Sequence, residues 1–93
     1  MAALNLYRLT PINLPQAWAR HYDSFYGAIV AARDARDAAT IHPRMTTPES
    51  HAWESESTIK EWAPSPQFVK TTLIGVATTR TRRGVIFAGF NDG

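Results

Sequence analysis

Two strand-length runs occupy the last quarter of the chain, FVKTTLIGVATT at residues 68–79 and GVIFAGF at residues 84–90. Both contain the β-branched and aromatic residues that favour strands, and the short segment between them holds Arg80, Arg82 and Arg83. Gly84 suits a positive φ at a bulge. The pattern predicts that the two runs pair antiparallel as a hairpin with the arginines at its tip.

Two further strands and one helix are expected upstream. Residues 4–12 alternate over a strand length, and residues 25–32, FYGAIVAA, form a continuous apolar run typical of a buried strand. The second run passes directly into an alanine-rich segment in which Asp34 is suited to be an N-cap and Asp37 follows three positions later. Pro43 ends this segment, so a helix of two to three turns is predicted.

A long connection separates the helix from the last two strands. Residues 44–67 contain three prolines and several serines and glutamates, together with Trp53 and Trp62. The predicted order is therefore two strands, a helix, a long connection and two strands, in a single domain over residues 1–93. This order is typical of the α+β class, with a mostly antiparallel four-stranded sheet and one short helix packed on one face.

Composition excludes several classes of protein. The chain has 93 residues and no cysteine, so it can form neither disulfides nor thiolate metal sites. It contains no apolar segment near the roughly 20 residues that span a bilayer, and no basic lead followed by a long apolar run at its N-terminus. We therefore expect a soluble, cytoplasmic protein that does not associate with membranes.

Charge is unevenly distributed along the chain, although the net charge is only +2 and the pI is about 9.4. Residues 46–62 hold four glutamates and one lysine, whereas residues 63–93 hold Lys70, Arg80, Arg82 and Arg83 but only one aspartate. The arginines, with Lys70, are candidates for contact with phosphates. Without a neighbouring aromatic platform or a binding module, a solvated turn is the favoured interpretation of the arginines.

Metal binding and catalysis have little support in the pattern. His42, His51 and Glu54 have a His-x8-His-x2-Glu spacing that matches no established zinc site. The glycines form no phosphate-binding loop, and no nucleophile lies in a catalytic motif. We therefore expect no catalytic residue, no metal, no cofactor and no enzymatic activity.

The tryptophans are a stronger indication of function than the histidines or the glycines. Trp53 and Trp62 flank an acidic segment bounded by prolines. Most tryptophans belong to the core, but an exposed tryptophan is a frequent anchor of a protein interface. Both tryptophans are therefore candidate partner-binding residues together with Arg80, Arg82 and Arg83.

Several short stretches resemble a loose group of short bacterial proteins with no assigned function. These stretches are YRLTP near the start, a tryptophan a few residues later, IVAARDARDAATI, and EWAPSPQFV before a strand. They cover about half of the chain. The resemblance implies the strand–helix–strand arrangement and a bacterial or phage origin, but no site residues. Glu61 stands before Trp62 where the group usually has a proline.

These observations favour a small, non-enzymatic protein-interaction module. We expect it to bind another protein, its own copy included, with a homodimer as the simplest assembly. The alternatives are a nucleic-acid-binding protein that uses the basic hairpin tip, and a small-molecule enzyme or metal-binding protein. Binding that weakens steeply with salt would indicate the first alternative.

Overall fold

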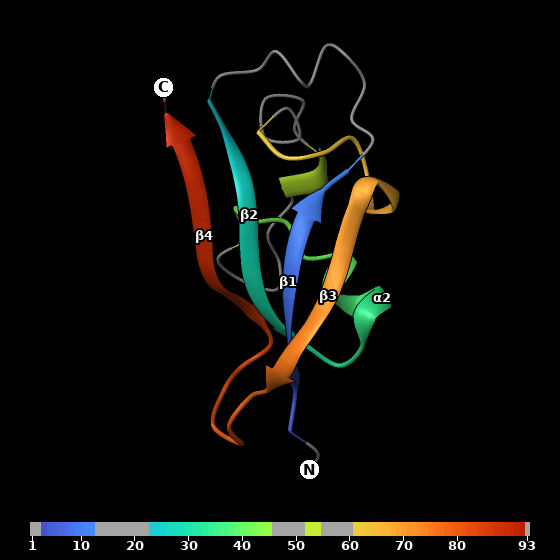
Figure 1. Cartoon of the computed structure of the whole chain (residues 1–93), viewed down its shortest axis with the longest axis vertical. Coiled ribbons are helices and arrows are strands. Elements are labelled where there is room, and N and C mark those ends of the chain that lie inside the picture. The colour runs from blue at the N-terminus through green and yellow to red at the C-terminus, as the bar shows by residue number, and fades with distance from the viewer. Residues whose placement is uncertain (1–2, 13–22, 46–51, 55–60, 93) are drawn as a thin grey trace.

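The fold is an antiparallel sheet of four strands with one short helix, and it belongs to the α+β class (Figure 1). A computed structural model describes residues 3–12, 23–45, 52–54 and 61–92. The strands are β1 (Asn5–Pro11), β2 (Asp23–Ala32), β3 (Val69–Val76) and β4 (Gly84–Asp92). Helix α2 covers Ala35–Ala39, and two 3₁₀ turns, η1 (Ala52–Glu54) and η2 (Pro66–Phe68), belong to the long connection.

The four predicted strands and their order along the chain are confirmed, but the predicted hairpin is wrong. The order across the sheet is β3-β1-β2-β4, with every neighbouring pair antiparallel. The last two strands therefore lie at opposite edges, and Figure 1 shows β1 and β2 between them.

The segment between β3 and β4 crosses the end of the sheet instead of folding back on itself. At the end of β3, the backbone N–H of Ala77 donates to the carbonyl oxygen of Leu4 at 2.7 Å, which holds the chain beside the start of β1. A turn follows, closed by the Thr81 N–H on the Thr78 carbonyl oxygen at 3.0 Å. Gly84 has a φ of 142° where the chain enters β4. The crossing needs about 14 Å, three strand spacings, which residues 77–83 easily span.

Helix α2 begins as predicted and ends earlier. The Asp34 carboxylate accepts a hydrogen bond from the Asp37 backbone N–H at 2.8 Å, so Asp34 is the N-cap. The helix ends after five residues rather than two to three turns. Both the backbone N–H and the hydroxyl of Thr40 donate to the Asp37 carbonyl oxygen, at 3.2 and 2.6 Å, which tightens the last turn and stops the helix.

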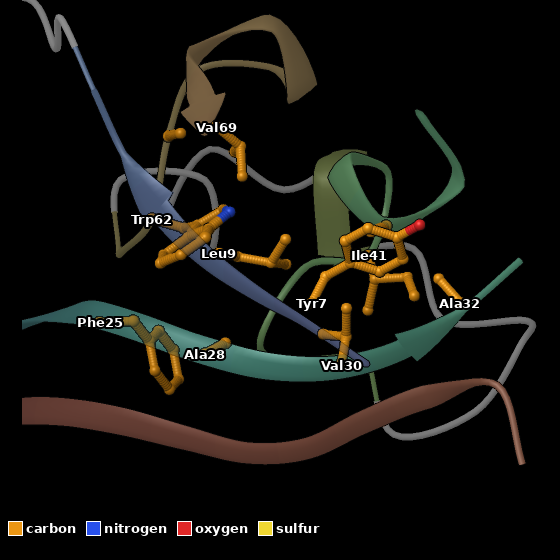
Figure 2. Close-up of a cluster of buried hydrophobic side chains, with 11 residues drawn as sticks. Tyr7, Leu9, Phe25, Ala28, Val30, Ala32, Ile41, Trp62 and Val69 are labelled. Atoms are coloured by element: carbon orange, nitrogen blue, oxygen red, sulfur yellow. The ribbon is translucent and has the colours of Figure 1, made fainter. Parts of the chain in front are cut away.

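One face of the sheet packs into the hydrophobic core. Figure 2 shows Leu9 of β1 and Val30 of β2 among the core side chains, together with Ile41 and Trp62 from the segments that cover this face. We call this side of the sheet the inner face. The buried cluster consists of Tyr7, Leu9, Phe25, Ala28, Val30, Ala32, Ala38, Ile41, Trp62, Ala63 and Val69.

The end of the long connection is tied to the sheet by backbone hydrogen bonds. The N–H of Phe25 donates to the Glu61 carbonyl oxygen at 2.7 Å, and the N–H of Ile12 donates to the Phe68 carbonyl oxygen at 2.8 Å. These bonds hold Trp62 against the inner face. Within the described ranges, no helix has the length and apolar character that a membrane crossing requires.

Candidate functional site

The three arginines between β3 and β4 do not act as one group. Arg83 reaches back to helix α2, where its Nε lies 3.0 and 2.9 Å from the two carboxylate oxygens of Asp37 and its Nη2 lies 2.7 Å from Oδ1. Nη2 also donates to the Thr40 hydroxyl at 3.3 Å. The interpretation of the segment as a solvated turn is therefore wrong for Arg83, which joins residues 46 positions apart.

Asp37 is the centre of this network. Its side chain is only 7% exposed, and it accepts hydrogen bonds from Arg83 and from both the backbone N–H and the guanidinium of Arg33. The hydrogen bonds from Arg83 hold the pKa of Asp37 well below its usual range; burial opposes this shift, and Arg33 reinforces it. The network fastens the crossing segment to the helix, with the Arg83 guanidinium bound to Asp37.

Arg80 and Arg82 remain exposed, and neither makes an ion pair with a residue in the described ranges. Lys70 is also exposed, but it stands on β3 at the first edge of the sheet, whereas Arg82 precedes β4 at the other. The basic residues that are close in sequence therefore do not form one surface. Lys70 lies at one edge of the sheet, Arg82 lies near the other, and Arg83 is bound to Asp37.

The two candidate tryptophans belong to the core and its border. Trp62 is 1% exposed, and its ring packs with that of His42 at 6.5 Å between centroids. Trp53 is half-buried, its ring centroid lies 5.1 Å from that of His42, and its Nε1 donates to the Thr40 carbonyl oxygen at 2.7 Å. Both side chains are thus engaged within the chain, as the core interpretation of tryptophan expects.

His42 is fully buried between these rings. Its Nδ1 accepts a hydrogen bond from the Arg44 backbone N–H at 3.0 Å. Of the proposed metal spacing, His51 lies outside the described residues and Glu54 is exposed. Within the described part of the chain, no group of three or more potential ligands gathers around a common point.

The large exposed apolar side chains lie instead on the strands. They are Tyr26 of β2, Leu73, Ile74 and Val76 of β3, and Ile86 and Phe87 of β4. Each is between 48% and 68% exposed, which is far more than a core side chain shows. These residues stand on rigid strands rather than on loops, but they do not all share one side of the sheet. Leu73 pairs with the buried Tyr7 and therefore lies on the side that carries the core.

Strand register places part of this surface in one row across the sheet. Phe87 pairs with Ile29, Ile29 pairs with Arg8, and Arg8 pairs with Thr72. Their neighbours Val85 and Ala88 on β4 pack against the core cluster. Since side chains alternate between the two sides of a strand, this row lies on the side away from the core, which we call the open face.

Tyr26 extends the open face over β4. The register of β2 shifts between Phe25 and Gly27, so Tyr26 is the extra residue of a bulge. Its ring lies on Gly89, where an added Cβ would overlap the ring carbons and the hydroxyl. The ring and Phe87 therefore lie side by side on the last strand. We call Tyr26, Ile29, Ile86 and Phe87 the aromatic patch.

This patch was not predicted from the sequence, although one signal for it exists there. Runs 25–32 and 84–90 are apolar almost throughout, which predicts strands with two apolar faces. Only one short helix was predicted to cover the sheet, and a single short helix can cover one face only. Apolar residues on the uncovered face should have been expected to stay exposed.

Comparison of the chain with protein-family models, with curated proteins and with solved structures finds no match. The resemblance to a group of short bacterial proteins thus stays a prediction. The open face of the sheet is therefore the basis for the proposed function.

Proposed function

We propose that the chain is a small non-enzymatic protein-interaction module that binds its partner through the open face of the sheet. The observation that carries this proposal is the aromatic patch, in which Tyr26 is 65% exposed and Phe87 is 59% exposed on adjacent strands. Adjoining exposed apolar groups on a folded surface mark interaction sites, and aromatic side chains are common anchors of protein interfaces.

The chemistry of the patch favours a protein over a nucleic acid. Aromatic rings can stack on bases, but Ile29 and Ile86 cannot, and aliphatic side chains are well suited to an apolar protein surface. The row that contains Phe87 holds one cation, Arg8. A phosphate backbone would require more positive charge along the same surface.

The test compares two double variants by affinity capture from nuclease-treated lysate, with quantitative mass spectrometry. The first, Tyr26→Ser with Phe87→Ser, removes the anchors of the patch. The second, Arg80→Ser with Arg82→Ser, is a matched control that changes two exposed residues outside it. Expected is a protein that the parent chain and the arginine variant both retain and the patch variant loses, with direct binding then confirmed using purified proteins.

Two results would contradict the proposal. One is equal capture by the parent chain and the patch variant. The other is binding that disappears on nuclease treatment or in the arginine variant alone, which would favour the nucleic-acid alternative with Arg80 and Arg82 as its contacts.

A further inference from the structure

The open face carries cations as well as aromatic rings. Arg8 of β1 stands between Tyr7 and Leu9, which both belong to the buried cluster, so its side chain lies on the open face. Lys70 of β3 follows the buried Val69 and lies on the same face by the same alternation. Both residues are exposed. Among the strand residues whose side chains the structure describes, these two are the only charged ones.

Strand register places the two cations close to each other. Arg8 pairs with Thr72 and Lys70 pairs with Thr10, so the cations are diagonal neighbours on adjacent strands. Such neighbours lie about 7–8 Å apart, which long side chains can span. Neither cation forms an ion pair with another residue of the described ranges. This part of the open face therefore has charge of one sign, and its complement is negative charge.

Each cation shares a row across the sheet with an aromatic ring. In the first row, Phe87 on β4 and Arg8 on β1 are separated by one strand, β2. In the next row, two residues further along each strand, the Tyr26 ring lies over β4 and Lys70 stands on β3. Because neighbouring strands are about 4.8 Å apart, ring and cation are about 10 Å apart in the first row and about 14 Å apart in the second. The open face is thus aromatic over β2 and β4 and positive over β1 and β3.

An acidic protein segment fits this face better than a second copy of the chain does. Carboxylates accept charge-assisted hydrogen bonds from arginine and lysine, and an apolar side chain of the same segment can pack on the aromatic patch. Two open faces packed together would bring both pairs of cations into one interface, with no acid among the described strand side chains. Buried charges without partners oppose such an assembly.

A nucleic acid is a less suitable anion for the same face. Its backbone requires cations along the whole path of the strand. The described strands offer Arg8 and Lys70 alone, both on one side of the aromatic patch. Arg80 and Arg82 belong to the segment that crosses the end of the sheet and do not continue either row.

We propose that the partner of this chain places an acidic segment on the open face, with an apolar side chain against the aromatic patch and carboxylates on Arg8 and Lys70. If the segment is extended and crosses the strands, its carboxylates stand about three or four residues from its apolar anchor, since each residue spans about 3.3 Å. This inference rests on the proposed function, because the aromatic patch belongs to both, and it states what the other protein must carry.

The first experiment selects ligands for the parent chain from a random peptide library displayed on phage. Recovered peptides should combine a large apolar residue with Asp or Glu about three or four positions away. A recovered peptide is then synthesised in two forms, one with its carboxylates and one with amides in their place, and the dissociation constants are measured by fluorescence anisotropy. The amide form should bind about tenfold or more weakly.

A charge exchange assigns the contact to the two cations. Arg8→Glu with Lys70→Glu should weaken the acidic peptide about tenfold or more, and should gain binding of a third form of the peptide that has lysines in place of its acids. A variant that had merely lost its fold would gain nothing. Arg80→Glu with Arg82→Glu has the same change of charge outside the face and is the control, expected to bind the acidic peptide as the parent chain does.

The outcomes separate this inference from the proposed function. Recovery of no peptide, recovery of peptides without acids, or equal affinity of the parent and charge-reversed chains would overturn the acidic partner. If Tyr26→Ser with Phe87→Ser then loses the peptides without acids, the patch still stands as the binding surface. Equal peptide affinity of the parent chain and that patch variant would overturn both proposals.

Two further probes test the other occupants of the face. A mixed-sequence single-stranded DNA oligonucleotide that displaces the acidic peptide, with an affinity that falls steeply with salt, would overturn the acidic partner in favour of a nucleic acid. A mass of two chains in sedimentation equilibrium, lost in Tyr26→Ser with Phe87→Ser, would place a second copy on the open face instead.

Discussion

Trp62 and Phe87 are both large aromatic residues of the same chain, yet Trp62 is 1% exposed and Phe87 is 59% exposed. Trp62 packs against the inner face of the sheet, in the buried cluster that includes Ile41 and Ala63. Phe87 lies on the open face, which no described helix covers. The difference shows that an apolar residue stabilises this fold only where the chain has a second layer to place over it.

The largest expected effect comes from truncation on the inner face. Trp62→Ala removes a fully buried indole from the cluster that includes Leu9 and Phe25, and should lower the free energy of unfolding by about 3–5 kcal/mol. Urea denaturation followed by circular dichroism measures the change. A loss below about 1 kcal/mol would show that the inner face is not the stabilising side of the sheet.

The next largest loss of stability is expected at the ion pairs of Asp37, which hold the crossing segment to helix α2. Asp37→Asn removes the charge that Arg83 and Arg33 share, and should cost about 2 kcal/mol at neutral pH. Because folding lowers the pKa of Asp37, its stabilisation is complete above the unfolded pKa of about 4 and is lost as the pH falls further. The parent chain should therefore lose more stability than Asp37→Asn between about pH 5 and pH 2. Parallel losses in both proteins would contradict this assignment.

Two arginines of the crossing segment give a matched comparison. Arg83→Ser leaves the buried Asp37 with Arg33 as its remaining cation and should cost about 1–2 kcal/mol. Arg80→Ser changes an exposed side chain and should stay within about 0.5 kcal/mol. Equal thermal unfolding midpoints for the two variants would show that the ion pair of Arg83 does not hold the segment.

The N-cap of helix α2 should contribute less to stability than the ion pairs of Asp37. Asp34→Ala removes the acceptor of the Asp37 N–H hydrogen bond and should cost about 1 kcal/mol. Asp34→Ser keeps a capping oxygen and is the control, expected within a few tenths of a kcal/mol of the parent. An unchanged denaturation midpoint for Asp34→Ala would remove Asp34 from the role of cap.

The smallest effect on folding is expected on the open face. Phe87→Ser should change the free energy of unfolding by no more than about 0.5 kcal/mol, because the side chain is 59% exposed. Urea denaturation followed by circular dichroism measures the change. A destabilisation approaching that of Trp62→Ala would mean that Phe87 belongs to the core, and the contrast between the two faces would fail.

Local signals predicted the local structure well. β-branched and aromatic runs predicted all four strands, and the Asp34 carboxylate predicted the start of the helix, because these preferences act over a few neighbouring residues. The end of the helix was harder to predict. The sequence predicted that Pro43 ends it, but Thr40 stops it earlier through two hydrogen bonds to the Asp37 carbonyl oxygen.

The chain by itself determined which segments are strands and where the helix begins. Only the tertiary structure decided that β3 and β4 take opposite edges, that Arg83 binds Asp37, and that Trp62 is covered while Phe87 is not. Two antiparallel strands have the same short-range sequence pattern whether a hairpin joins them or the chain crosses the end of the sheet between them. The choice between them depends on contacts between residues far apart in the chain, such as Ala77 with Leu4 and Arg83 with Asp37.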